Sequence, residues 1–182
     1  VAGLVPLRAR GDGLLPVPGW RDEYEWTGFI PFEALPREYN PEAGLIVTAN
    51  NRLVGDDYPY HITHEWAPDY RLDRITALLA TKGPISLEDS RIVQLDVRSE
   101  LAAALVPHIL HAAGTVGAHA VRTPGMEAAL EELRRWDFEM TANTVAGTIV
   151  HVFYNQLLAH VLADELGADD LDLYRGDSRS HL

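Results

Sequence analysis

The chain has 182 residues, and its net charge of −12, from 27 acidic and 15 basic side chains, argues against a nucleic-acid-binding protein. Hydrophobic residues make up 47% of the chain, which is enough for a packed core and excludes wholesale disorder. Cysteine is absent, which excludes disulfides, thiolate metal sites and a cysteine nucleophile. No uninterrupted apolar run reaches the roughly 18 residues that cross a bilayer, so we expect no membrane span.

The first part of the chain, residues 1–69, is dense in proline, glycine and aromatic residues and predicts short strands and loops. We expect a strand at residues 1–9, followed by a tight turn at "RGDG". The stretch "LIVTANN" predicts another strand at residues 44–49, which ends in two adjacent asparagines. A long loop over residues 50–69 should follow.

The second part, residues 70–182, has the apolar spacing that is typical of helices. One side of its first predicted helix carries Leu72, Ile75, Leu78 and Leu79. Ser86 is the predicted N-cap of the next helix, and Pro107 predicts a kink or break in the one after it. The tail from Ala168 is expected to fray. Strands followed by helices favour an α+β fold over alternating strands and helices.

Asn50 is the first candidate for chemistry, because an amide at the end of a strand offers N–H donors on a rigid mount. Acyl transfer needs such a donor near the oxygen that becomes negative in the tetrahedral intermediate. The alternative is a turn whose amides satisfy only nearby backbone groups. The residues alone do not decide between these two interpretations.

Arg71 is the second candidate and lies at the start of a predicted helix. A cation there is unfavourable, because the helix dipole is positive at that end. Arg71 is therefore either solvated or held in place by a partner. Its guanidinium could fix Asn50, or a nearby carbonyl, through its fork of donors.

Histidines give a third set of candidates. The segment "HITHE" contains His61, His64 and Glu65, but it lacks the helical HExxH arrangement of zinc hydrolases. His108 and His111 lie three positions apart on a predicted helix, and no third ligand is evident. A histidine-based metal hydrolase is therefore kept as an alternative. The chain has no G-x-S-x-G or S-x-x-K motif that would supply a nucleophile.

Four motifs, "LPVPG", "EWTGFIPF", "YNPEAG" and "ANNR", occur in that order between Gly11 and Leu79. Together they resemble the second half of the β-chain of penicillin acylases, which are N-terminal-nucleophile (Ntn) hydrolases. The resemblance is looser over the helical remainder. It implies that residues 1–182 are the C-terminal portion of such a β-chain, with a strand and loop part at 1–69 and a helical part at 70–182. The implied fold is part of a four-layer αββα sandwich.

The resemblance also implies a reaction, the hydrolysis of linear amides such as penicillins or related N-acyl compounds. In the family, self-cleavage exposes a serine whose hydroxyl attacks the amide while its α-amine acts as the base. By position, Asn50 would donate its side-chain N–H to the oxyanion, and Arg71 would hold the serine amine and Asn50. Arg74 is the fallback if the alignment shifts. The serine and most of the acyl pocket should lie upstream, so we expect this chain to be a fragment that is inactive alone.

Calcium is a further cofactor that the resemblance implies. Gly13 matches the position whose backbone carbonyl is a calcium ligand in the family. The family's aspartate ligand falls at Ile62 or Thr63, which cannot replace an anionic ligand, and the other ligands would lie upstream.

The implied partners are the upstream α-chain and the N-terminal part of the β-chain, together with a small-molecule amide substrate. The implied location is periplasmic or extracellular. The alternative function is a non-catalytic binding or scaffold module that kept the fold and lost the reaction.

Overall fold

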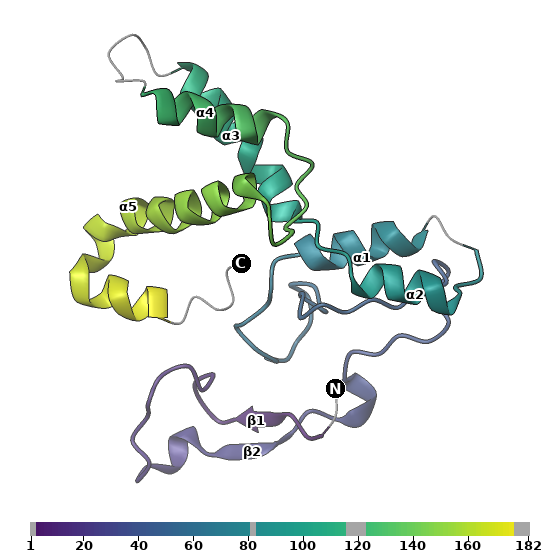
Figure 1. The fold of residues 1–182 in the computed structure, drawn as a ribbon. Coiled ribbons are helices and arrows are strands. Elements are labelled where there is room, and N and C mark those ends of the chain that lie inside the picture. Colours follow the sequence, from purple (N-terminus) through teal and green to yellow (C-terminus); the bar gives the residue numbers. More distant parts are fainter. Residues whose placement is uncertain (1–2, 81–82, 116–122, 177–182) are drawn as a thin grey trace. The chain divides into compact units, whose positions relative to one another are not determined.

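The structure, a computed structural model, describes residues 3–80, 83–115 and 123–176. The chain divides into two compact units, Val1–Leu79 and Ala80–Leu182. The strands of the described residues lie in the first unit, and helices predominate in the second (Figure 1). The predicted order of strands before helices is therefore confirmed.

A two-stranded antiparallel sheet lies near the start of the first unit. β1 (Pro6–Arg8) pairs with β2 (Trp26–Phe29), and the two strands run side by side in Figure 1. Two short 3-10 helices, η1 (Asp22–Tyr24) and η2 (Phe32–Ala34), precede and follow β2. The strand predicted at the beginning of the chain is thus confirmed over β1.

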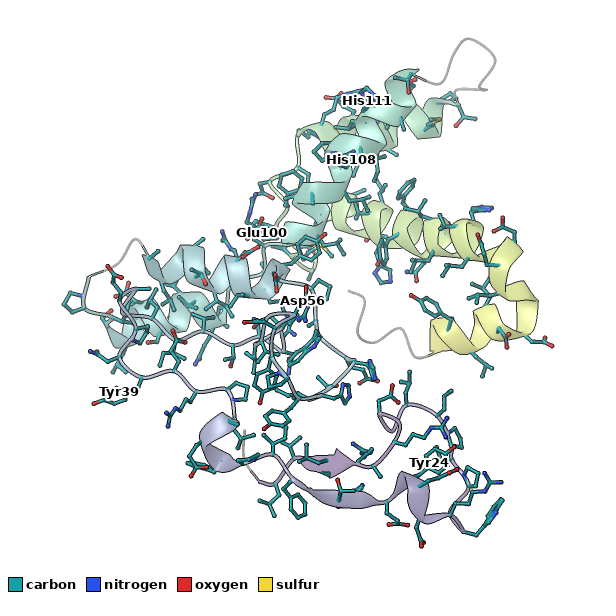
Figure 2. All side chains as sticks on the ribbon, turned by 180° about the vertical axis from the view of Figure 1, so that it is seen from behind. Tyr24, Tyr39, Asp56, Glu100, His108 and His111 are labelled. Carbon is teal, nitrogen blue, oxygen red and sulfur yellow. The ribbon has the colours of Figure 1, made fainter. Side chains whose placement is uncertain are left out.

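Few apolar side chains of the first unit are buried. Ile30 and Ala49 are buried, with exposed fractions of 3% and 6%. By contrast, Trp20 is 84% exposed and Phe32 76% exposed. Tyr39 is 95% exposed, and its ring projects away from the chain (Figure 2). The described residues of this unit therefore leave large aromatic surfaces without cover.

The prediction of a strand at residues 44–49 is wrong, because the structure has no strand there. Leu45 and Val47 are half-buried while Ile46 and Thr48 are exposed, which is the alternation of an extended segment. The segment nevertheless belongs to no sheet of the described residues. A strand exists only where a neighbouring strand exchanges backbone hydrogen bonds with it, and the apolar pattern alone cannot supply that neighbour.

The helices of the structure are α1 (Tyr70–Ala80), α2 (Leu87–Gln94), α3 (Glu100–Thr115), α4 (Pro124–Arg134) and α5 (Val145–Gly176). The predicted N-cap of α2 is confirmed, because Ser86 Oγ accepts a hydrogen bond from the Asp89 backbone N–H at 3.1 Å. The Asp89 carboxylate in turn accepts one from the Ser86 N–H at 3.0 Å, which completes a capping box. The predicted apolar side of α1 is also half-buried.

The core of the second unit forms where α3, α4 and α5 meet, and α3 and α4 lie side by side in Figure 1. Its buried members are Ala102, Val106, Leu133, Ala146 and Val150. Trp136 and Phe138, in the connection after α4, pack against this cluster. The helices therefore bury one apolar stripe each, as their sequence spacing predicts.

Two helix predictions need correction. Pro107 does not break α3, which continues to Thr115. Pro107 itself is exposed while its neighbour Val106 is buried, so packing of the apolar stripe outweighs the one missing hydrogen bond. The tail predicted to fray from Ala168 is helical to Gly176. The interruption lies at Gly167 (φ 72°, ψ 177°), because glycine accepts positive φ without a steric penalty.

One helix among the described residues bears on the expectation of no membrane span, without overturning it. Val145–Gly167 of α5 is 23 residues long and contains an 18-residue window with a mean hydropathy of 1.3, which by length and composition alone is enough to cross a membrane. Polar side chains interrupt its apolar residues, so the sequence shows no uninterrupted apolar run here. The core helix of a water-soluble protein can have the same length and composition, so this helix does not by itself place the chain in a membrane.

Candidate functional site

Asn50 lies in a tightly held turn of the first unit. Its backbone has φ 62°, in the left-handed region that asparagine tolerates better than most residues. Its carbonyl oxygen accepts a hydrogen bond from the Ala67 backbone N–H at 2.8 Å. This bond closes the loop of residues 51–66, so the two ends of the loop meet at Asn50.

Arg71, in the first turn of α1, is the main partner of the Asn50 side chain. Its Nη2 donates to the Asn50 side-chain oxygen Oδ1 at 3.0 Å and to the Ala49 carbonyl oxygen at 2.7 Å. The predicted contact between Arg71 and Asn50 is therefore present. Two acceptors compensate for the unfavourable position of the cation at the positive end of α1.

The contact with Arg71 fixes the direction of the Asn50 amide. A guanidinium can only donate, so the group that faces it has to be the amide oxygen. The amide nitrogen Nδ2 then faces the other way, and no described residue accepts a hydrogen bond from it. Asn50 is an exposed residue. The turn therefore presents an N–H donor outward, which is the group that oxyanion stabilisation requires.

Asn51 holds the same turn from inside. Its side chain is 6% exposed. Oδ1 accepts from the Ala49 backbone N–H at 3.0 Å, and Nδ2 donates to the Arg52 carbonyl oxygen at 3.0 Å. The two asparagines thus have different tasks, because Asn51 satisfies local backbone groups while Asn50 leaves its amide nitrogen outward. The rigid mount predicted from a strand is instead a hydrogen-bonded turn.

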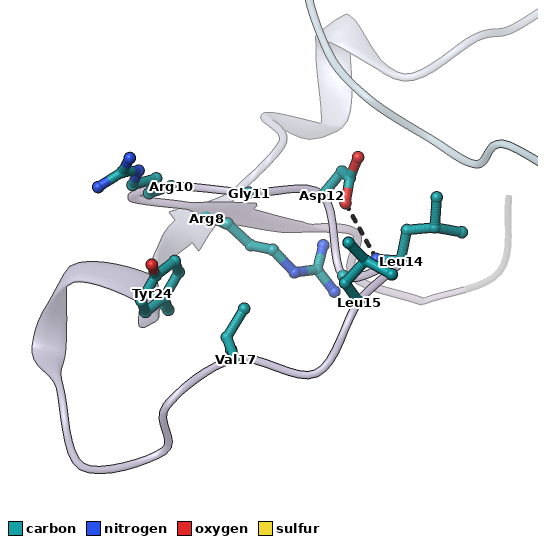
Figure 3. Close-up of a pocket in the computed structure, with 9 residues that line it drawn as sticks. Arg8, Arg10, Gly11, Asp12, Leu14, Leu15, Val17 and Tyr24 are labelled. Atoms are coloured by element: carbon teal, nitrogen blue, oxygen red, sulfur yellow. Dashed lines mark hydrogen bonds between the residues drawn. The ribbon is translucent and has the colours of Figure 1, made fainter.

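Gly13 lies in the turn between β1 and η1 and lines a pocket. Figure 3 shows this pocket with the neighbouring Asp12 and Leu14 labelled. The pocket is lined by Arg8, Arg10, Gly11, Asp12, Gly13, Leu14, Leu15, Val17 and Tyr24. The neighbouring Asp12 carboxylate accepts from the Leu14 N–H at 2.9 Å, and its other oxygen lies 2.9 Å from His64 Nε2. These two contacts, that of Leu14 first, hold the pKa of Asp12 below its ordinary value.

The surroundings of Gly13 do not by themselves fit calcium. A Cβ atom built on Gly13 would lie 3.0 Å from the Arg8 guanidinium, so a cation already occupies this side. Calcium takes six to eight oxygen ligands, and the described part of the chain holds no group of three or more acidic, histidine or cysteine side chains suited to a metal. Calcium binding at Gly13 stays a prediction, and no step proposed here uses it.

The histidines do not form a metal site among the described residues. The rings of His61 and His64 lie 4.3 Å apart, and His64 is paired with Asp12. His108 and His111 lie exposed on α3 (Figure 2). The alternative of a histidine-based metal hydrolase therefore gains no support from the geometry.

Sequence reasoning missed two contributors to the turn. The backbone N–H of Ala67 has no residue-type signature, so no pattern could have identified it. Asn51 was identified only as the second member of the asparagine pair. It is buried because its side chain folds back onto the Ala49 and Arg52 backbone, across a left-handed residue that strand alternation does not cover.

Comparison with known proteins agrees with the motifs. A sequence model of the penicillin amidase family matches residues 1–181. Penicillin acylase 2 proenzyme of Pseudomonas sp. strain SE83 is 38% identical over 90% of this chain and 20% of its own length. Acyl-homoserine lactone acylase QuiP of Pseudomonas syringae pv. tomato is 30% identical over 93% of this chain and 21% of its own length.

Penicillin G acylase of Escherichia coli is 32% identical over 74% of this chain and 16% of its own length. The chain thus spans about a fifth of the length of the first two relatives, and all three are named as acylases. The family predicted from the motifs is confirmed, and the chain belongs to the penicillin amidase family.

Proposed function

We propose that this chain is the C-terminal part of an amidohydrolase that cleaves linear N-acyl amides and that Asn50 is its oxyanion-stabilising residue. The attacking group is the hydroxyl of an N-terminal serine in the upstream part of the protein, and the serine α-amine removes its proton. As the carbonyl carbon becomes tetrahedral, its oxygen gains negative charge. Asn50 Nδ2 donates a hydrogen bond to that oxygen.

The observation that carries this proposal is the orientation of the Asn50 amide. Arg71 occupies its oxygen, and no described residue occupies its nitrogen. In the intact site Arg71 keeps the donor aimed and adds positive charge close to the developing oxyanion.

Uncovered apolar surface supports the proposed place of the chain in a larger enzyme. Trp20, Phe32 and Tyr39 are each more than three-quarters exposed in the first unit. Their burial against the upstream α-chain and the N-terminal part of the β-chain would remove this surface from water. In that assembly the first unit would complete the four-layer αββα sandwich.

The substrate class rests on the relatives' names. They are a penicillin acylase and an acyl-homoserine lactone acylase, and both names describe cleavage of an N-acyl amide. We propose the same bond type for this chain, without assigning the acyl group, because the acyl pocket belongs to the upstream part.

Complementation tests the proposal. The purified 182-residue chain should not hydrolyse a chromogenic phenylacetyl amide or an N-acyl-homoserine lactone, because it lacks the serine and its α-amine. Co-expression with the upstream part of the same protein should restore turnover of at least one of these probes. Co-expression of that part with a chain carrying Asn50→Gly is the matched control and should not restore it. Turnover by the unmodified chain alone would contradict the proposal.

A further inference from the structure

The loop of residues 51–66 is tied to other segments of the first unit at two points among the described residues. Tyr58 donates its hydroxyl to the Ala34 carbonyl oxygen at 2.8 Å, which fixes the first half of the loop. His64 Nε2 lies 2.9 Å from the Asp12 carboxylate, which fixes the second half. The second tie joins positions 52 residues apart in the sequence.

The tie at His64 lies close to the bond that holds Asn50. His64 precedes Ala67 by three residues, and the Ala67 N–H donates to the Asn50 carbonyl oxygen. The Glu65 N–H donates to Thr63 Oγ1 at 3.0 Å across His64, which restrains the backbone at His64 itself. Only two residues separate His64 from Ala67, so a displacement of His64 is expected to shift the Ala67 backbone as well.

Both members of the tie are themselves held. The Asp12 carboxylate also accepts from the Leu14 N–H, so its position is set by the turn after β1. The His64 ring packs against the His61 ring at 4.3 Å between centroids, which restricts its rotation. In this contact the Asp12 carboxylate is the acceptor and His64 Nε2 the donor, and both are restrained although each side chain is 44% exposed.

We propose that Asp12 and His64 are positioning residues for the oxyanion donor Asn50, an inference that rests on the proposed function. The tie anchors the loop to the β1–β2 hairpin and thereby keeps Ala67 bonded to the Asn50 carbonyl. Loss of the tie lets the Asn50 turn shift relative to the reacting carbonyl. Small displacements of a catalytic donor lower the rate of the chemical step more than they weaken substrate binding.

Steady-state kinetics of the complete enzyme test this proposal with four single variants and one double variant. His64→Ala removes the donor, and His64→Gln keeps an N–H donor at similar reach. Asp12→Ser keeps an oxygen for the Leu14 N–H but is too short to reach residue 64. The matched control is Asp56→Ala, because among the described residues Asp56 pairs only with Arg52, inside the same loop, at 2.7 Å.

The expected result is a split between kcat and KM. His64→Ala and Asp12→Ser should each lower kcat by about threefold to tenfold and leave KM within about twofold, since a shifted donor acts on the transition state. His64→Gln should recover most of kcat, and Asp56→Ala should match the unmodified enzyme. The double variant with His64→Ala and Asp12→Ser should be no slower than either single variant, because both remove the same contact.

The outcomes separate this inference from the proposed function. Unchanged kcat in His64→Ala and Asp12→Ser, or equal losses in Asp56→Ala, would overturn the positioning role. Additive losses in the double variant would do the same. The proposed function fails independently if replacement of Asn50 itself leaves kcat unchanged. Melting temperatures measured on each variant identify any loss that comes from unfolding.

Discussion

Replacement of Asn50 by glycine in the complete enzyme should lower kcat by about a hundredfold or more while KM stays nearly constant, because only the donor to the oxyanion is lost. Glycine is the right replacement, since it accepts the φ of 62° that alanine would resist. The backbone bond from Ala67 to the residue 50 carbonyl is therefore kept. The measurement is steady-state hydrolysis of an amide substrate by the purified, processed enzyme.

Asn40→Gly is the matched control for this substitution. Asn40 is also an exposed asparagine with positive φ, 47°, and its side chain has no contact with Arg71. The control should leave kcat unchanged, which shows that loss of an asparagine from a left-handed turn is harmless in itself. If Asn50→Gly also retained full kcat, the oxyanion role would be wrong.

Replacement of Arg71 by methionine should lower kcat by about tenfold to a hundredfold, because the Asn50 amide is then free to rotate and its donor is misplaced. Methionine keeps a long apolar stem on α1 but removes both hydrogen bonds, to Asn50 Oδ1 and to the Ala49 carbonyl. Arg71→Lys should recover part of the rate, because its ammonium can donate to one of the two oxygens but lacks the planar guanidinium.

Arg74 provides the discriminating comparison for this prediction. It is the arginine that would take over the role if the alignment with the family shifted, and it lies one turn further along α1. Arg74→Met should have a smaller effect on kcat than Arg71→Met. A larger loss in Arg74→Met would reassign the supporting role to Arg74.

Local signals in the sequence predicted the helices well. Ser86 with Asp89 forms the capping box because both partners lie within one turn, so no distant contact is needed. The apolar face of α1 follows from residue spacing alone. The penalty for a cation at a helix start also pointed to a partner for Arg71, and the structure places Asn50 there.

Features that depend on partners distant in the sequence could not be predicted from the sequence. The segment 44–49 has the residues of a strand, but strand pairing needs a neighbour that its own pattern cannot specify. The closure of the loop at Ala67 depends on a backbone N–H, which every residue except proline carries. The tie between Asp12 and His64 joins two polar surface residues whose separation in sequence gives no signal.

The central claim is the direction of one amide nitrogen, and a crystal structure of the complete enzyme with a tetrahedral transition-state analogue bound to its nucleophile tests it most directly. The claim predicts that Asn50 Nδ2 lies about 2.7–3.1 Å from the oxygen that represents the oxyanion, with Arg71 still bonded to Oδ1. A structure in which Nδ2 turns back toward its own loop, or in which another group contacts that oxygen instead, would contradict it.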